Sequence, residues 1–492
     1  MLRGEGVARI GSLTRAFRWE APLIVAGVLA LSYWIGTQAW SLAGLSLSSN
    51  PVRLLAVLGV IALLAFAIRD LPRALTLLVI VAGVVDLPIG TGTESKINLA
   101  MILTALIAAA WLLKMLVQRR TPLLVASNVN RPLLLFIAVL LFSWLLGYAL
   151  WDFRVMLPSD ALRVQAGQVG VFVLSAAALL LGANVPLGER TLRIWTLVAI
   201  GIAVLGQAAL VVNLAKLPIL AIVQPPLAIG FVLLLSQLLL NTSLKPGLKL
   251  LGWATAAVWA VATVGTYRFS FVGSWLPIAA GAALVLWFRS KRLFFFALVL
   301  GLVVLVVHPG PFLRELDIKS SSGSLLRPYI WWDIIRMTSR SPISMLFGLG
   351  PVNYKWDWSD PSFVSLSRYM TTGFEAGYAP PAHNMFIDIY AQTGLVGMAL
   401  FASVLLAIGR IGLGLLSRVE PGFMRAYVAG VVAGFAGLAI SSGITADWLI
   451  PFVYNIGLNG FRGSVYAWLL AGTLVGLYAQ QRDRNRGARQ NA

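Results

Sequence analysis

The sequence predicts an all-α polytopic membrane protein with about 14 transmembrane helices and one large loop outside the cytoplasm. Of its 492 residues, 59% are hydrophobic and 11% are charged, whereas soluble domains carry about 25% charged residues. Apolar runs of about 20 residues, the length that crosses a bilayer, recur along the chain. The runs do not alternate apolar and polar residues as β-barrel strands do. Lys and Arg residues fall in alternate connections between the runs.

Charges and turn residues between the apolar runs define the expected spans. They lie near residues 21–40, 52–68, 71–90, 97–117, 132–150, 162–183, 192–214, 218–240, 248–267, 270–288, 291–308, 384–409, 423–446 and 462–480. Arginines precede the first run and no small-residue cleavage site follows it, as in a signal anchor that stays attached.

The distribution of Lys and Arg predicts that both termini are cytoplasmic, because positive charge in short loops stays on that side. With the N-terminus inside, 24 of the 38 basic residues lie in inner segments, and seven of the remaining 14 lie in the loop 309–383. The net charge of +20 is therefore interpreted as the result of basic residues that set the topology and attract anionic membrane lipids. No nucleic acid is expected as a partner.

Four regions are expected along the chain. Residues 1–217 form an N-terminal multi-span region, and residues 218–308 form core spans with an arginine in an outer turn. Residues 309–383 form the large loop outside the cytoplasm that is expected to carry the chemistry. Residues 384–492 hold the last spans and a basic cytoplasmic tail.

The composition excludes several kinds of site. The chain has no cysteine, so disulfides, thiolate metal sites and cysteine nucleophiles are excluded. Its two histidines, His308 and His383, are too few for a typical His-rich metal centre. We expect no metal ion and no cofactor.

Polar residues at the outer ends of the spans are candidates for function, because charge at membrane depth is costly. The alternative for each is a snorkelling side chain or a structural ion pair. The candidates are Asp152, Arg154, Asp160, Arg163, Arg268, Arg327, Arg336, Arg340, His383, Asn384, Asp388 and Asp447.

Arg268 and His383 have the most informative positions. The turn TYRFSF holds Arg268 close to the outer hydrocarbon boundary, where its planar guanidinium suits a phosphate or diphosphate ligand. His383 lies where the long loop re-enters the membrane, and Asn384, a good N-cap residue, begins the next helix. The helix dipole disfavours imidazolium, so the ring is expected to be neutral and able to accept a proton. A hydrogen-bonded surface histidine is the alternative.

A short helix at the membrane interface is expected within the loop. Residues 328–337 place Trp331, Trp332, Ile334 and Ile335 among charged residues, a pattern typical of interfacial helices. The tryptophans either anchor the loop at the bilayer or stack on sugars, and anchoring is favoured.

Four segments of the chain, in this order and spacing, resemble the bacterial O-antigen ligase and O-antigen polymerase superfamily. They are QPPLAIGFVLLL (224–235), TYRFSF (266–271), RPYIWWDIIRMTSRSPISMLFGLG (327–350) and HNMFIDIYAQTGLVGMALF (383–401). The element HN…GLxG is the most specific piece. QPP stands where the family has an asparagine, and Tyr267 stands where it has a serine before the turn arginine.

The resemblance implies a GT-C-like, metal-independent and inverting glycosyltransferase of the bacterial inner membrane. Its donor would be a glycan on undecaprenyl diphosphate, and its acceptor a hydroxyl of a glycan or lipid at the periplasmic face. His383 would be the general base, with Arg268 and Arg327 binding the diphosphate. The further residues expected to bind substrates are Arg163, Arg336, Arg340, Asn384 and Asp388.

Other functions remain open from the sequence. A flippase for lipid-linked glycans, or another polysaccharide transporter, would place ionisable groups near the bilayer midplane, and Asp86 inside the expected span 71–90 is the main such group. A membrane scaffold without enzymatic activity is disfavoured by the ordered set of Arg and His. Lipopolysaccharide core, another lipid-linked repeat and a protein hydroxyl all remain possible acceptors.

Overall fold

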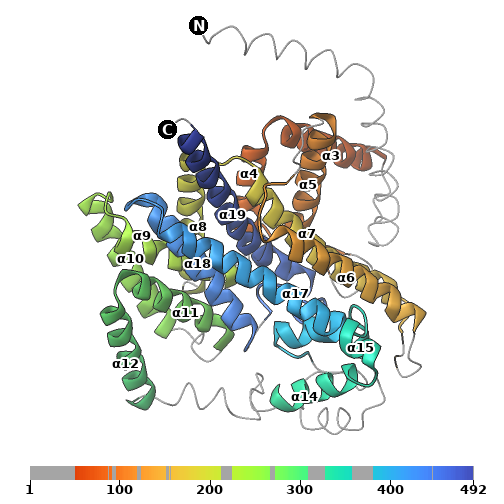
Figure 1. Ribbon diagram of the computed structural model, residues 1–492. Helices are drawn as coiled ribbons and strands as arrows, with labels where there is room; N and C mark the ends of the chain where they lie inside the picture. The colour runs from red at the N-terminus through yellow and green to blue at the C-terminus, as the bar shows by residue number, and fades with distance from the viewer. Residues whose placement is uncertain are drawn as a thin grey trace.

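The structure is a computed structural model that describes residues 50–86, 88–90, 96–118, 124–150, 155, 157–211, 224–265, 272–307, 327–356, 381–445 and 447–490. Helices make up nearly all of it (Figure 1). The first half holds α3 (Asn50–Arg69), α4 (Leu71–Val84), α5 (Leu99–Gln118), α6 (Asn130–Ala149), α7 (Ala161–Asn184) and α8 (Glu189–Val211). A two-stranded antiparallel hairpin, β1 (Pro88–Gly90) and β2 (Lys96–Asn98), joins α4 to α5, with Ile89 opposite Ile97.

The second half begins with four apolar helices and ends with three longer ones. The first four are α9 (Gln224–Leu240), α10 (Pro246–Gly265), α11 (Val272–Arg289) and α12 (Lys291–Val307). Short helices follow in the long loop: α14 (Arg327–Thr338), α15 (Pro342–Phe347) and the 3-10 helix η4 (Asn353–Trp356). The last elements are α17 (Met385–Leu416), α18 (Phe423–Ser442), the 3-10 helix η5 (Leu458–Gly460) and α19 (Phe461–Gln490).

Each expected span from 52–68 onward overlaps a helix, and the first, 21–40, lies outside the described residues. Seven helices of the described chain are long and apolar enough to cross a membrane. They are Leu99–Val117, Asn130–Ala149, Ala161–Asn184, Glu189–Ala208, Val272–Arg289, Met385–Leu416 and Phe423–Ser442. The chain is thus helical and multi-pass in character, and the total of about 14 spans stays a prediction.

The expected span 71–90 is too long at its C-terminal end. Asp70 caps α4 by accepting a hydrogen bond from the Arg73 amide at 3.1 Å, but the helix stops at Val84. Pro88 then opens β1, where a residue that cannot donate from its backbone is tolerated at a strand start. Asp86 therefore lies beyond the helix, and its carboxylate is 3.3 Å from the buried Arg462 guanidinium.

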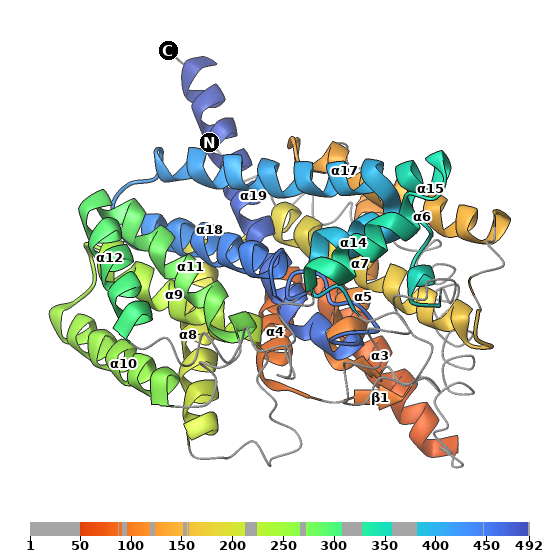
Figure 2. The same ribbon diagram turned by 90° about the horizontal axis from the view of Figure 1, so that it is seen from below.

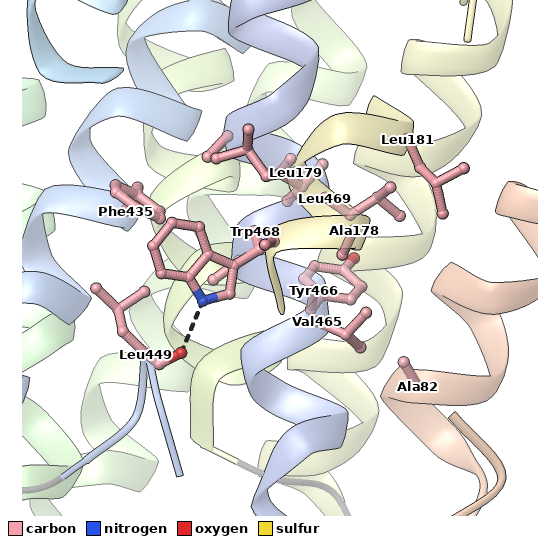
Figure 3. Packing of buried hydrophobic residues seen from close by; sticks show 14 of the residues in the cluster. Ala82, Ala178, Leu179, Leu181, Phe435, Leu449, Val465, Tyr466, Trp468 and Leu469 are labelled. Carbon is pink, nitrogen blue, oxygen red and sulfur yellow. Dashed lines mark hydrogen bonds between the residues drawn. The ribbon is translucent and has the colours of Figure 1, made fainter. Parts of the chain in front are cut away.

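The centre of the molecule is the contact between α7 and α19, which α18 and α4 flank (Figure 3). Trp468 packs here with Phe435 and Leu179, and its indole N–H donates to the Leu449 carbonyl at 2.8 Å. A Cβ on Gly472 would stand 2.2 Å from the Leu179 carbonyl oxygen. Glycine thus lets the two helix backbones touch, as in many membrane helix pairs.

One end of the molecule gathers the short helices of the loop around the start of α17 (Figure 2). α14, α15 and η4 pack against α17, which also packs along α6. α17 is two helices in series, because Gly394 interrupts it with φ 67° and ψ −170°. This end brings together most of the residues that the sequence singles out.

Candidate active site

His383 directly precedes α17. Its φ of 49° lies in the left-handed region, which non-glycine residues adopt uncommonly and which often marks functional positions. Asn384 caps the helix: its Oδ1 accepts hydrogen bonds from the amides of Phe386 at 3.0 Å and Ile387 at 3.3 Å. The expected start of this helix is confirmed, and the cap fixes the backbone that carries the imidazole.

The expected short helix of the loop is also confirmed, as α14. Its indole Trp331 Nε1 donates to the carbonyl of Ala382 at 2.7 Å, one residue before His383. Ile330, Ile334 and Met337 are buried in a small cluster with Ala382. Trp331 therefore holds the loop in place, whereas its neighbour Trp332 is 66% exposed.

Arg327 begins α14 and is the buried cation of the site, with 5% of its surface exposed. Its Nη1 donates to the carbonyl of Ile444 at 3.2 Å, just beyond α18. The positive charge of Arg327 lowers the pKa of His383. Arg327 and His383 are thus electrostatic neighbours, brought together by α14 from opposite ends of the described loop.

The two glycine elements of the sequence contact each other at the break in α17. The break at Gly394 leaves the carbonyls of Ala391 and Gln392 free of the regular ladder, and they accept from the amides of Leu349 at 2.8 Å and Gly350 at 3.2 Å. A Cβ on Gly394 would lie 2.2 Å from the Leu346 carbonyl carbon. The GLG of the loop and the GLxG of α17 therefore form one main-chain contact that needs glycine.

η4 follows this contact and carries Lys355 into the site. Asn353 fixes it: its Oδ1 accepts from Gln165 of α7 at 2.6 Å, and its Nδ2 donates to the Leu349 carbonyl at 2.7 Å. Lys355 is buried, with its ammonium nitrogen 5.3 Å from the centre of the Tyr454 ring. Burial lowers the pKa of Lys355 to about 7, against the opposing effect of the Asp388 carboxylate.

Asp388, one turn into α17, is fully buried. Its Oδ1 accepts hydrogen bonds from the hydroxyls of Tyr354 and of Tyr454, the latter at 2.7 Å. Its Oδ2 has no hydrogen-bond partner among the described residues. Burial and the Asp388 charge raise the pKa values of both tyrosines well above their usual range. Asp388 thus supports the site from inside.

Asp447 is a second buried carboxyl, in the connection between α18 and α19. Asn455 donates its side-chain N–H to Oδ2 of Asp447. Burial, and then the charge of Asp388, raise the pKa of Asp447 well above its usual range, while Arg327 acts in the opposite direction. The site therefore pairs two basic residues with two carboxyls in a volume that water does not screen.

The imidazole of His383 is neutral at physiological pH, as expected, but for a different reason. Its pKa falls to about 4, chiefly because of burial and then because of the charges of Arg327 and Lys355. The helix dipole, which is the cause expected from the sequence, is not among these causes. A neutral imidazole can accept a proton from a hydroxyl.

The remaining predicted residues lie apart from this group. Arg163 is exposed in the first turn of α7. Arg336 is half-exposed on α14 and pairs with Asp333 at 3.4 Å, and Arg340 is exposed after the same helix. Arg268 lies outside the described residues. The structure thus gathers His383, Asn384, Asp388 and Arg327, and it leaves Arg163, Arg336 and Arg340 on the surface.

Sequence reasoning missed Lys355, Tyr354 and Tyr454. A signal existed for the first two, because NYKW follows the GLG element after only two residues, within the segment expected to carry chemistry. Tyr454 had none, since it follows an apolar stretch. Among the residues that the structure describes, no group of three or more His, Cys, Asp or Glu side chains could hold a metal ion.

The comparison with protein families bears directly on this region. Residues 256–402 match the family model described as O-antigen ligase. The match includes Arg327, both glycine elements and His383, and it confirms the resemblance to the O-antigen ligase and polymerase superfamily. It supports an O-antigen ligase-type membrane enzyme.

Two other comparisons add little. No curated protein matches the chain. A chain of a solved structure described as "Structural coordination of polymerization and crosslinking by a peptidoglycan synthase complex" is 18% identical, and the alignment covers 72% of this chain and 98% of that one with a TM-score of 0.40. The O-antigen ligase match is the comparison that supports the enzyme class.

Proposed function

We propose that this protein transfers a glycan from an undecaprenyl-diphosphate carrier to an acceptor hydroxyl at the outer face of the bacterial inner membrane. The observation that carries the proposal is the neutral His383, held at the start of α17 beside Arg327 and within the region that matches O-antigen ligases. The enzyme would be inverting and independent of metal ions, with cytoplasmic termini.

His383 acts in this proposal as the general base. Its neutral ring takes the proton of the acceptor hydroxyl, and the oxygen attacks the anomeric carbon of the donor sugar. The bond from that carbon to the diphosphate oxygen breaks, and the diphosphate leaves with the electron pair. Attack from the opposite face inverts the anomeric configuration.

The arginines stabilise the leaving group. Arg327, buried next to His383, offers a permanent positive charge in a poorly screened site, where such stabilisation is strongest. Arg268 is proposed as the second diphosphate ligand. Arg163, Arg336 and Arg340 are proposed to bind donor or acceptor at the surface. Asn384 and Asp388 orient His383 through the helix cap and the buried network.

Transport is the second candidate function, and one structural observation weakens it. Asp86 lies beyond the end of α4 and pairs with Arg462, so it is a structural ion pair. The other buried charges of the described chain include Arg327, Lys355, Asp388 and Asp447, which belong to the group around His383. If a variant with a neutral residue at Asp86 lost glycan export but kept normal glycan linkage, that result would favour transport.

The test compares His383→Ala and Arg327→Ala with the wild type in purified protein supplied with a lipid-linked glycan and an acceptor. We expect release of polyprenyl diphosphate to fall by about 100-fold or more in His383→Ala, the usual size of general-base catalysis. Undiminished release in that variant would contradict the assignment of the base.

A matched control is Tyr329→Ala, because Tyr329 lies on α14 but is 66% exposed. It should leave release unchanged. In cells, the length distribution of the surface glycan separates the acceptors: short chains on a normal anchor indicate failed polymerisation, whereas full-length chains left on the carrier indicate failed ligation.

A further inference from the structure

A cavity of about 580 Å³ lies near the C-terminal part of α19, where α4, α5 and α7 converge on it. In Figure 1 the C-terminal end of α19 lies at the opposite end of the molecule from α14 and α15. The cavity is therefore separate from the candidate active site. Its walls combine apolar side chains with two cations and one carboxylate: Leu71, Trp111, Lys114, Met115, Leu124, Val125, Ala126, Asn184, Val185, Pro186, Ala479, Arg482 and Asp483.

The two cationic side chains of this cavity have hydrogen-bond donors that no described residue accepts from. Lys114 is partly buried and has no hydrogen bond or ion pair within the described residues. Arg482 uses Nη1 to donate to the Ala126 carbonyl at 3.3 Å, while its Nε is buried, has no hydrogen-bond partner and stands 3.7 Å from Oδ1 of Asp483. A buried donor without an acceptor is costly, so an acceptor from outside the protein would stabilise this group.

The amide in the wall is not available to a ligand. Asn184 accepts from the Val125 amide at 2.6 Å and donates to the Leu180 carbonyl at 2.8 Å. These bonds fasten residues 124–126 to the end of α7 and so build one wall. The ligand is consequently an acceptor of hydrogen bonds from cations, which means an anion.

Charge and shape together define the class of ligand. Two cations and one carboxylate leave a net charge of +1 in the wall, which one phosphodiester anion would balance. Trp111, Met115 and Leu71 supply apolar surface beside these charges. An amphipathic molecule with a single negative phosphate and hydrocarbon chains matches both the charged and the apolar parts of the wall. Basic pockets between membrane helices are known to bind such headgroups.

We propose that this cavity binds the phosphodiester headgroup of an anionic glycerophospholipid, with Lys114 and Arg482 contacting the phosphate oxygens. The acyl chains lie against the apolar wall and continue along the outside of the helices. This site is independent of the transfer reaction proposed above.

Native mass spectrometry of the purified full chain tests the proposal. Phosphatidylglycerol and phosphatidylethanolamine of identical acyl chains are titrated into the detergent-solubilised wild type, Lys114→Gln, and the double variant Lys114→Gln/Arg482→Gln. We expect one phosphatidylglycerol to bind the wild type at least about 10-fold more tightly than it binds the double variant, because charge-assisted hydrogen bonds are lost. Lys114→Arg, which keeps the charge, should retain binding.

The control is Lys249→Gln/Arg289→Gln, which makes the same charge change at exposed residues outside the cavity. It should bind phosphatidylglycerol as the wild type does. Equal binding of the two lipids by the wild type, or unchanged binding by a folded Lys114→Gln variant, would overturn the proposal. A third arm adds inorganic phosphate alone: if phosphate binds and phosphatidylglycerol does not, the ligand is a free anion and the lipid assignment is wrong.

Discussion

Glycine brings main chains into contact at two places in this molecule, and the two contacts differ in kind. Between α7 and α19, Gly472 sits in a regular helix and simply permits a close approach to the carbonyl of Leu179. Between the loop and α17, Gly348 and Gly394 have φ values of 79° and 67°, and the contact is made of hydrogen bonds to Ala391 and Gln392.

The two contacts should therefore affect different properties, the first the stability of the protein and the second its activity. The α7–α19 contact lies in an apolar core, and changing it alters how firmly the helices associate. The loop contact is followed directly by Lys355 and preceded along α17 by Asp388 and His383. Changing this contact moves charged groups that act on one another, so it should affect the activity of molecules that remain folded.

The largest effect is expected for Gly394→Val. Gly394 has φ 67° and ψ −170°, a conformation that is essentially restricted to glycine and costs another residue about 1–3 kcal/mol, and the added Cβ would overlap the Leu346 backbone at 2.2 Å. We expect a lower Tm in detergent and loss of transfer activity in the protein that survives. Gly409→Ala in the same helix, where nothing lies within 4 Å, is the control. A normal activity in Gly394→Val would show that the contact does not position the site.

Gly472→Val tests the other contact. Overpacking of this kind typically costs about 1–3 kcal/mol, so we expect a lower Tm and less protein in the membrane. Activity per folded molecule should stay near the wild-type value, which transfer assays normalised to folded protein can measure. Gly170→Ala of α7, with open space around it, is the matched control. A loss of activity per folded molecule in Gly472→Val would contradict the assignment of the α7–α19 contact to stability alone.

Tyr354→Phe should have a smaller effect. It removes one of two donors to Asp388 Oδ1 and leaves Tyr454 in place, a loss of about 1.5–3 kcal/mol for a hydrogen bond to a charged group. We expect a modest drop in Tm and a several-fold drop in activity. Tyr390→Phe removes a hydroxyl that contacts Ser339, just after α14, and not Asp388, so this variant should retain more activity.

Lys355→Met should change only the pH dependence at acid pH. The pKa of His383 is about 4 in the wild type, so the base stays neutral until the pH falls to that value. Lys355, with a pKa of about 7, is charged throughout that range and disfavours imidazolium. Its removal raises the pKa of His383, so the acid limb of the rate profile moves to higher pH. An acid limb that does not move would show that the charge of Lys355 does not affect the pKa of His383.

The sequence predicted the helices well because unbroken apolar runs leave the backbone few alternatives in lipid. It also singled out His383, Asn384 and Arg327, which the structure brings together, since polar groups stand out against such a background. It could not place Tyr454 next to Asp388, because that contact joins residues 66 positions apart. It predicted a span, 71–90, that is longer than α4, because composition alone does not reveal that the helix ends before Asp86, whose carboxylate pairs with Arg462.

The hydrogen bond from Trp331 to the carbonyl of Ala382 joins residues 51 positions apart and closes the chain between them into a ring. Within this stretch the described residues Trp356 and Ala382 are both buried. This single bond therefore fixes α14, which begins at Arg327, against the backbone just before His383.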